Sequence, residues 1–317
     1  MRAASYEKIA HTPSISREEW LELRKTGIGG SDAGAILGLN RYSTAFSVYC
    51  DKLGLTPEKE DSEAMRQGRD LEEYVAQRFC ESEGKAVKRF NFMIRSKKYP
   101  FAIADVDRVI VGENALLECK TTSPRNPTDF EGGEIPPYWY CQCQHYLAVT
   151  GCNVCYLAVV VLGKAYYCFK IWRDEKEIEA LMGFERDFWE NNVLAKVEPS
   201  PDGSKTADEV IKQMYEHSNE DLATVDLTPF SEAIKEYARL GGEIAELTGK
   251  RDAIEQELKL YLKEAEVGEC DGARITWKSQ TSRRIDTKRL KAEMPEVYEQ
   301  YANESVSRPF RIKILEE

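Results

Sequence analysis

Apolar residues recur at intervals of three and four in several stretches of the first two-thirds of the chain. This period is typical of amphipathic helices, because residues so spaced share one helix face. The predicted helices span residues 16–25, 27–40, 44–53, 66–83, 137–149 and 174–194. The second begins in the glycine-rich stretch GIGGSDAG, where Ser31 and Asp32 are expected to cap its N-terminus.

The pattern changes between residues 86 and 121, where short apolar runs and alternating positions are typical of strands. We predict strands at 86–95, 101–111 and 114–121, with a turn at Gly112–Asn114 joining the last two. Two later apolar runs flank Gly163 and Lys164 and predict a β-hairpin. Helices interleaved with strands in this order indicate a mixed α/β domain.

The last third of the chain is organised differently. The stretch EPSPDGSKTADE at 198–209 is typical of a linker. Beyond it, apolar positions from Ile234 to Leu262 predict one long helix, which could be an arm for self-association or could pack on the first domain. We expect a hairpin around Asp271–Gly272, a helix at 286–301 and a strand at 307–315. The predicted domains are therefore 1–200, an acidic linker at 201–230, and a C-terminal long helix with a small α/β module at 231–317.

Composition limits the class of protein. Hydrophobic residues make up 42% of the chain, enough for a sizeable core, yet no run of about 18 apolar residues could cross a membrane. The first twenty residues lack the apolar core of a signal peptide, and the nine cysteines are odd in number and scattered. We therefore expect a cytoplasmic protein with reduced thiols and no membrane partner.

The net charge of −11 argues at first against a nucleic-acid partner, because phosphate binding needs positive charge. The acidic residues are concentrated, however: residues 201–250 hold 11 of them against 5 basic ones. Basic residues cluster instead at 85–98 and 274–291. Each cluster is either solvated surface or a contact for a DNA backbone.

The pattern that carries chemistry is an Asp, a Glu and a Lys within AIADVDRVIVGENALLECKTT, residues 102–122. Glu118 and Lys120 are two apart on one predicted strand, so their side chains leave the same face. A tight turn would bring Asp107 beside them from the preceding strand. Two carboxylates supply the oxygen ligands that Mg²⁺ or Mn²⁺ prefers, and a nearby lysine can orient or deprotonate a water. The alternative is an ordinary hairpin with surface charges.

Four sequence blocks resemble, in the same order, the YqaJ-like viral recombinase family, relatives of the lambda-phage-type exonuclease within the PD-(D/E)xK nucleases. They are LRKTGIGGSDAGAILGLNRYSTAF (23–46), GRDLEEYV (68–75), ADVDRVIVGENALLECKT (104–121) and YWYCQCQHYLAVTG (138–151). The resemblance covers about residues 16–200 and implies a restriction-endonuclease-like core, a mixed central sheet flanked by helices.

The resemblance assigns roles to the third block. Asp107 and Glu118 would hold the catalytic metal, with the backbone carbonyl of Cys119 as a third ligand. Lys120 would position the attacking water. Asp105 shares a strand face with Asp107, and it would either compete for the metal or be a decoy.

Two further blocks add residues to this site. By resemblance, Glu72 binds a second metal or its water shell, whereas Glu73 lies about 100° further round the helix and faces solvent. Gln142 and Tyr146 are four apart and share a helix face. Gln142 would bind the metal-bound water or the DNA backbone, and Tyr146 would contact DNA. Gln144 lies about 200° from Gln142 and must point elsewhere.

The first block is expected to recognise a DNA end. In the exonuclease relatives an Arg and a Ser at the spacing of Arg24 and Ser31 contact the 5′-phosphate, and amides at a helix N-terminus favour phosphate. The alternative is a tight turn with a helix cap. Elsewhere, His145 is expected to pack rather than catalyse. Cys152 and Cys155 are expected to be buried thiols and not ligands of an iron–sulfur cluster, because no second CxxC follows.

These observations lead to one expected function and two alternatives. The first is a phage- or prophage-encoded, Mg²⁺- or Mn²⁺-dependent exonuclease acting in the bacterial cytoplasm. It would resect double-stranded DNA ends 5′→3′ and leave 3′ single strands for a single-strand-annealing protein. By resemblance it would form a homotrimer. The alternatives are a structure- or end-specific endonuclease and a non-catalytic module that binds DNA ends.

Overall fold

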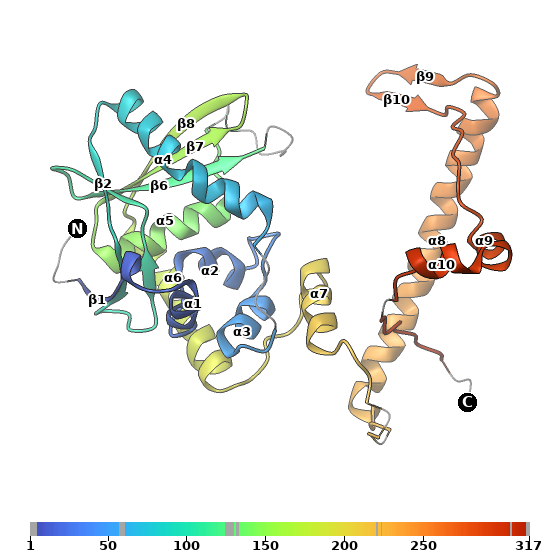
Figure 1. The fold of residues 1–317 in the computed structure, drawn as a ribbon, viewed down its shortest axis with the longest axis horizontal. Coiled ribbons are helices and arrows are strands. Elements are labelled where there is room, and N and C mark those ends of the chain that lie inside the picture. Colours follow the sequence, from blue (N-terminus) through green and yellow to red (C-terminus); the bar gives the residue numbers. More distant parts are fainter. Residues whose placement is uncertain are drawn as a thin grey trace. The chain divides into compact units, whose positions relative to one another are not determined.

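The computed structural model describes residues 5–56, 61–123, 130, 133–219, 221–222, 224–304 and 306–314. Parts of the predicted 201–230 linker and of the predicted 307–315 strand lie outside these ranges. The chain forms two compact units, residues 1–215 and 216–317. Figure 1 shows the elements of both. None of the helices in the described ranges is long and apolar enough to cross a membrane.

The first unit contains seven α-helices in its described residues. They are α1 (Arg17–Lys25), α2 (Gly30–Ile36), α3 (Ala45–Leu53), α4 (Glu63–Glu83), α5 (Pro137–Thr150), α6 (Glu175–Phe188) and α7 (Lys205–Met214). A π-helical turn, Trp189–Leu194, follows α6 directly. The helices predicted from periodicity are therefore confirmed, with one extra: α7 lies within the stretch expected to be linker, and its Ala207 is buried against the first unit's core.

The strands of the first unit form two sheets. They are β1 (Tyr6–His11), β2 (Val87–Arg89), β3 (Phe92–Ser96), β4 (Ile103–Asp105), β5 (Arg108–Ile110), β6 (Ala115–Thr122), β7 (Val154–Val161) and β8 (Ala165–Trp172). Five strands pair in the order β2-β5-β6-β7-β8, and three pair in the order β1-β3-β4. Among the described strands of the central sheet, β6 and β7 are the one parallel pair, which makes the sheet mixed, and α5 is the crossover between them. The mixed α/β fold is thus confirmed.

Two strand predictions were wrong in detail. The expected strands 86–95 and 101–111 each break in two, because the chain leaves one sheet and enters the other. The first break follows Arg89 and the second falls at Val106–Asp107. The Gly112 turn and the Gly163 hairpin are as predicted, and both glycines adopt the positive φ that such turns require.

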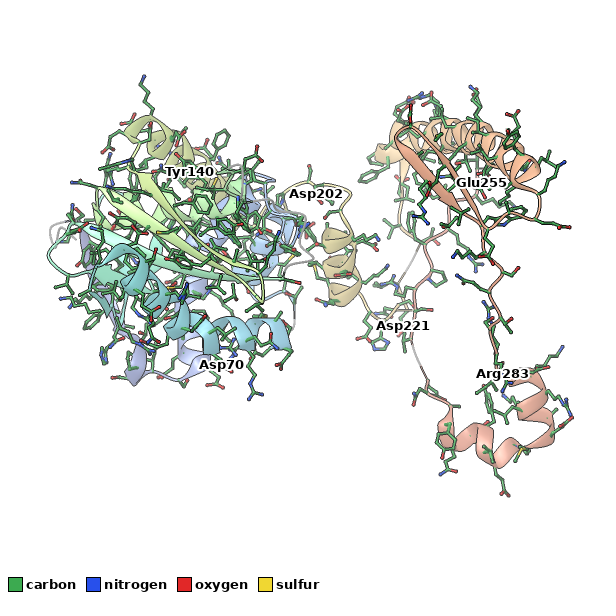
Figure 2. All side chains as sticks on the ribbon, turned by 90° about the horizontal axis from the view of Figure 1, so that it is seen from above. Asp70, Tyr140, Asp202, Asp221, Glu255 and Arg283 are labelled. Carbon is green, nitrogen blue, oxygen red and sulfur yellow. The ribbon has the colours of Figure 1, made fainter. Side chains whose placement is uncertain are left out.

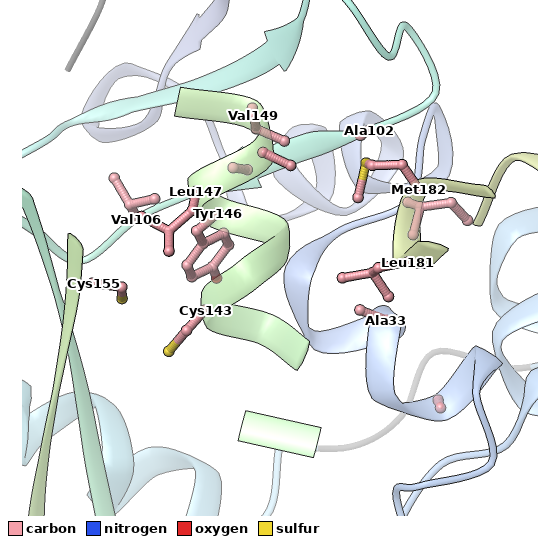
Figure 3. Close-up of a cluster of buried hydrophobic side chains, with 14 of the residues drawn as sticks. Ala33, Ala102, Val106, Cys143, Tyr146, Leu147, Val149, Cys155, Leu181 and Met182 are labelled. Carbon is pink, nitrogen blue, oxygen red and sulfur yellow. The ribbon is translucent and has the colours of Figure 1, made fainter. Parts of the chain in front are cut away.

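The central sheet is covered on both faces, as its apolar strands require. Every residue of β7 is buried. On one face, Val75 and Phe79 of α4 pack against Leu117 of β6. On the other, α2, α5 and α6 pack over Leu116 and Leu157. Figure 3 shows α5 side chains in this second cluster, with Cys143 and Tyr146 near Cys155 of β7.

The main element of the second unit is one long helix of 32 residues. It contains α8 (Ser231–Leu262), the hairpin β9 (Val267–Cys270) and β10 (Ala273–Thr276), and the short helices α9 (Thr287–Glu293) and α10 (Pro295–Tyr301). The long helix and hairpin were predicted correctly. Residues 306–314 are not a strand, and the expected 286–301 helix is interrupted at Met294, before Pro295.

Candidate active site

The break between β4 and β5 places Asp107 at the junction of the two sheets. Its carboxylate Oδ2 accepts a hydrogen bond from the backbone N–H of Cys119 on β6, at 2.8 Å. This contact fixes the Asp107 side chain beside the strand that carries Glu118 and Lys120. The juxtaposition predicted from the D-x(10)-E-x-K spacing is therefore present, although Asp107 lies in the bend rather than within a strand.

Alternation along β6 separates its side chains into two sets. Ala115, Leu117 and Cys119 contribute to the core beneath α4, whereas Leu116 packs on the α5 side. Glu118 and Lys120 belong to the second set by their spacing, and Lys120 Nζ lies 2.6 Å from Glu118 Oε1.

The helix α5 completes the hydrogen bonding of this face. Gln142 Nε2 donates to Glu118 Oε1 at 2.8 Å and to the Tyr146 hydroxyl at 3.0 Å. Gln144 points elsewhere, as predicted, and donates to the Tyr140 hydroxyl and the Trp172 carbonyl. Gln142 therefore fixes the orientation of the Glu118 carboxylate, which the family resemblance implies is a metal ligand.

The pKa values of the site residues are shifted because several carboxylates lie close together and are buried. Burial, together with repulsion from Glu118 and Glu72, raises the pKa of Asp107 well above its usual value. Burial alone would lower the pKa of Lys120, but the attraction of Glu118 and Asp107 outweighs it and raises that pKa. Lys120 therefore stays protonated at neutral pH, which favours it as a hydrogen-bond donor and argues against a role as general base.

The donor set fits a divalent cation. Glu118 Oε2 is buried and has no hydrogen-bond partner among the described residues. At Asp107, burial and repulsion from Glu118 and Glu72 raise the pKa by more than the charge of Lys120 lowers it. A hard cation would satisfy the orphan oxygen and relieve the repulsion. Within the described ranges no three His, Cys, Asp or Glu side chains form a ready-made metal site, so a backbone oxygen such as the Cys119 carbonyl would have to complete the ligand set.

Glu72 on α4 reaches the same region but is held by a cation. It pairs with Arg108, whose side chain is only 3% exposed and which also lies 3.1 Å from Glu73. Glu73 is 66% exposed, as predicted, and pairs with Arg89 at 2.6 Å. Sequence reasoning missed Arg108. Its signal was a charged residue directly after Asp107 in an otherwise apolar run.

Arg24 and Ser31 also come together as predicted. Arg24 Nη2 donates to Ser31 Oγ at 3.2 Å and lies 3.3 Å from Asp32 Oδ1. The capping prediction was wrong, however: Gly29 is the N-cap residue, and Asp32 Oδ2 accepts its N–H at 2.9 Å. Since Asp32 occupies that amide, an anion here would depend on Arg24 and Ser31.

A buried lysine, Lys52, contacts both Asp32 and the backbone of Arg24. The side chain of Lys52 is fully buried, lies 2.7 Å from Asp32 Oδ2, and donates to the Arg24 carbonyl at 2.9 Å. Burial by itself would raise the pKa of Asp32, but Lys52 and Arg24 lower it to about 2. The ionised Asp32 thus holds Arg24 and Lys52 in fixed positions.

A cavity of about 390 Å³ joins the two groups of residues. Its lining includes Arg24, Ser31, Glu72, Asp107 and Tyr146. Gly30 is required here, because a Cβ at this position would lie 2.5 Å from the Tyr146 ring. The cavity therefore connects the candidate anion site with the candidate metal site.

The remaining candidates have structural partners. Asp105 Oδ2 accepts a hydrogen bond from Trp20 Nε1 at 2.9 Å, and Asp105 lines the same cavity as Asp107 and Glu72. His145 is fully buried between Glu185, at 2.8 Å, and the Ile103 carbonyl, as expected for a packing residue. Figure 2 shows how densely side chains fill this unit.

Cys152 and Cys155 are both free and fully buried, as predicted.

The candidate site residues lie within a segment that is similar to a known protein family. Residues 19–153 match the YqaJ-like viral recombinase domain. The chain is also 40% identical over 317 residues to a Bacillus subtilis (strain 168) protein, "Uncharacterized protein YqaJ", covering 99% of each chain. The chain belongs to the YqaJ-like viral recombinase family.

Two solved exonuclease structures are similar to part of the chain. An alkaline exonuclease from Laribacter hongkongensis is 21% identical, with a TM-score of 0.47, over 57% of this chain and 94% of that one. A phage-related exonuclease from Haemophilus somnus 129PT is 13% identical, with a TM-score of 0.44, over 56% of this chain and 99% of that one.

Proposed function

We propose that the protein is a divalent-metal-dependent deoxyribonuclease that resects linear double-stranded DNA from its 5′ ends. The observation that supports this most directly is the convergence of Asp107, Glu118 and Lys120 from a bend and a strand that have no structural need for buried charge. Membership of a viral recombinase family fits such an activity, and the 3′ strand that remains would be the substrate of a single-strand-annealing protein.

The roles of the residues follow from their positions. Asp107, Glu118 and the Cys119 carbonyl would hold a catalytic Mg²⁺ or Mn²⁺, with Glu72 at a second ion or its waters. A bound cation of this kind stabilises charge at the scissile phosphate and lowers the pKa of water. Lys120, kept protonated by its carboxylate neighbours, would donate to the attacking water and fix its direction. Gln142 would hold Glu118 in the orientation this requires.

We infer the 5′ polarity from Arg24 and Ser31, which line the cavity together with Asp107. Arg24 and Ser31 present a guanidinium and a hydroxyl, the donors that a terminal phosphate accepts from. A phosphate bound there would bring the first phosphodiester of that strand into the cavity that Asp107 also lines. The enzyme would therefore shorten the 5′-ended strand.

The test uses linear and closed-circular duplexes with Mg²⁺ or EDTA, and linear duplexes labelled at either end. Progressive, Mg²⁺-dependent shortening of the 5′-ended strand of linear DNA is the expected result. Nicked circles would show an endonuclease instead. Binding of ends without cleavage would overturn the enzymatic proposal.

Lys120→Ala is expected to abolish cleavage while the protein stays folded. The matched control is Lys164→Ala, at an exposed lysine in the β7–β8 turn, which should retain full activity. Full activity of Lys120→Ala would refute the site assignment.

A further inference from the structure

Arg108 on β5 is a buried charged residue at a position where the core would accept an apolar one. Its side chain is only 3% exposed, and its cross-strand partner on β6 is the core residue Leu117. Ile110, two residues further along β5, also packs in the core beneath α4. Burying a guanidinium costs free energy unless its charge is paired and its N–H groups are bonded. Packing of the core therefore does not explain this arginine.

The contacts of Arg108 lie at the candidate active site. Its Nη1 donates to Glu72 Oε1 and, at 2.9 Å, to the backbone carbonyl of Asp107. Its Nη2 donates to Glu73 Oε2 at 3.1 Å. One guanidinium thus joins α4, which carries both glutamates, to the bend that carries Asp107. The planar fork of an arginine suits several fixed acceptors at once, whereas a lysine ammonium does not match them.

The two glutamates that Arg108 contacts differ in their surroundings. Glu72 lines the cavity together with Asp107 and Arg108, and its charge contributes to the raised pKa of Asp107. Glu73 is 66% exposed and bridges Arg108 to Arg89, the residue opposite Arg108 on β2. Two like charges directly opposite each other destabilise a sheet, and Glu73 offsets this repulsion. Glu73 therefore serves the sheet, whereas Glu72 belongs to the site.

Arg108 keeps two negative residues close together. Glu72 and Asp107 repel each other, and a cation that contacts both offsets this repulsion. We propose that Arg108 is a positioning residue of the nuclease, which holds Glu72 beside the Asp107 bend for its contact with a second ion or with metal-bound water. This role rests on the proposed function, because it concerns the same metal site.

The first experiment is a double-mutant cycle, measured as single-turnover cleavage of linear duplex DNA at saturating Mg²⁺. Arg108→Met should lower the rate constant by roughly tenfold or more, as Glu72→Gln should. Because Arg108 acts through Glu72, Arg108→Met should lower the rate by less than about twofold further when Glu72→Gln is already present. Two losses that simply multiply would overturn the proposal.

The second experiment separates positioning from loss of structure. It titrates each variant with Mn²⁺ in a calorimeter, without DNA. Arg108→Met removes a fixed positive charge beside the carboxylates, so it should bind Mn²⁺ at least as tightly as the unmodified protein. A disrupted Asp107 bend would weaken Mn²⁺ binding instead. Weaker Mn²⁺ binding by Arg108→Met would therefore show that Arg108 only maintains the fold, and it would overturn the proposal.

Arg173→Met is the matched control. Arg173 is also a partly buried arginine that pairs with a carboxylate, Glu175, and donates to a backbone carbonyl, that of Leu147. Its substitution should leave the cleavage rate and the Mn²⁺ affinity within about twofold of the unmodified values. Equal loss of cleavage in Arg173→Met and Arg108→Met would overturn a specific role for Arg108.

Arg108→Lys tests the guanidinium separately from the charge. The lysine keeps the positive charge but lacks the fork, so its cleavage rate should lie between those of Arg108→Met and the unmodified protein. A rate as low as that of Arg108→Met would overturn the contribution of the charge. Failure of the proposed function has a different signature, because the unmodified protein would then neither cleave DNA nor bind Mn²⁺, and the role of Arg108 would fall with it.

Discussion

Replacing Asp32 with Asn should destabilise the first unit strongly, although it changes the size of the side chain very little. Asp32 is almost fully buried and lies 2.7 Å from the buried Lys52. Its pKa falls from 3.8 to about 2, which corresponds to roughly 2.5 kcal/mol at about 1.4 kcal/mol per pKa unit. Breaking a buried pair costs about 3–5 kcal/mol, because the remaining charge is left unpaired. We therefore expect the free energy of unfolding to fall by about 2.5–5 kcal/mol.

The assay is urea unfolding followed by tryptophan fluorescence, since four of the five tryptophans lie in the first unit. Asp51→Asn, at the exposed neighbour of Lys52, is the control and should change stability by less than about 0.5 kcal/mol. Adding Lys52→Met to Asp32→Asn should restore part of the loss, because both charges are then removed. A loss below about 1 kcal/mol for Asp32→Asn, or simple addition in the double variant, would refute the argument.

The same pair gives the protein a defined dependence on pH. The folded-state pKa of Asp32 is lowered, so its stabilising contribution is complete above the unfolded value of 3.8. It is lost as the pH falls from about 4 to about 2. The Asp32→Asn variant should therefore show a smaller loss of stability over this range than the unmodified protein.

Three more predictions concern the active site. Mg²⁺ or Mn²⁺ should raise the melting temperature of the protein, because the bound cation would relieve the repulsion at Asp107. Asp107→Asn should remove most of that increase. An undiminished increase in the variant would contradict the proposal that Asp107 is a metal ligand. Glu72→Gln should lower the single-turnover rate of cleavage at least tenfold. Glu73→Gln, at the exposed neighbouring residue, should change that rate by less than about threefold. Arg24→Ala should slow degradation of 5′-phosphorylated ends far more than of 5′-hydroxyl ends, and equal loss on both would remove the phosphate-binding role.

Local patterns in the sequence were enough to predict which residues share a face. The two-residue spacing put Glu118 and Lys120 together, and helical geometry separated Gln142 from Gln144. Both inferences needed only the period of one element. The long helix and both hairpins were predictable for the same reason.

What the sequence did not reveal depends on contacts between distant segments. Arg108 bridges α4 and the Asp107 bend, and Lys52 reaches Asp32 from a different helix, so no local period predicts either pair. The strand β1 pairs with β3 some ninety positions later, and it was not predicted. The breaks within the predicted strands also arise from tertiary structure, because the chain passes there from one sheet to the other.

The alternation of side chains along β6 has a consequence for which metals the proposed site would select. Cys119 stands between Glu118 and Lys120 in sequence, and a thiolate among carboxylates would attract soft ions such as zinc or cadmium. The pleat turns its side chain to the core beneath α4, on the other face of the strand. Burial also raises the pKa of the thiol well above its usual value, so the sulfur stays protonated and is a poor ligand. In the proposed site, Cys119 would therefore contribute its backbone oxygen and not its sulfur, which favours a hard cation.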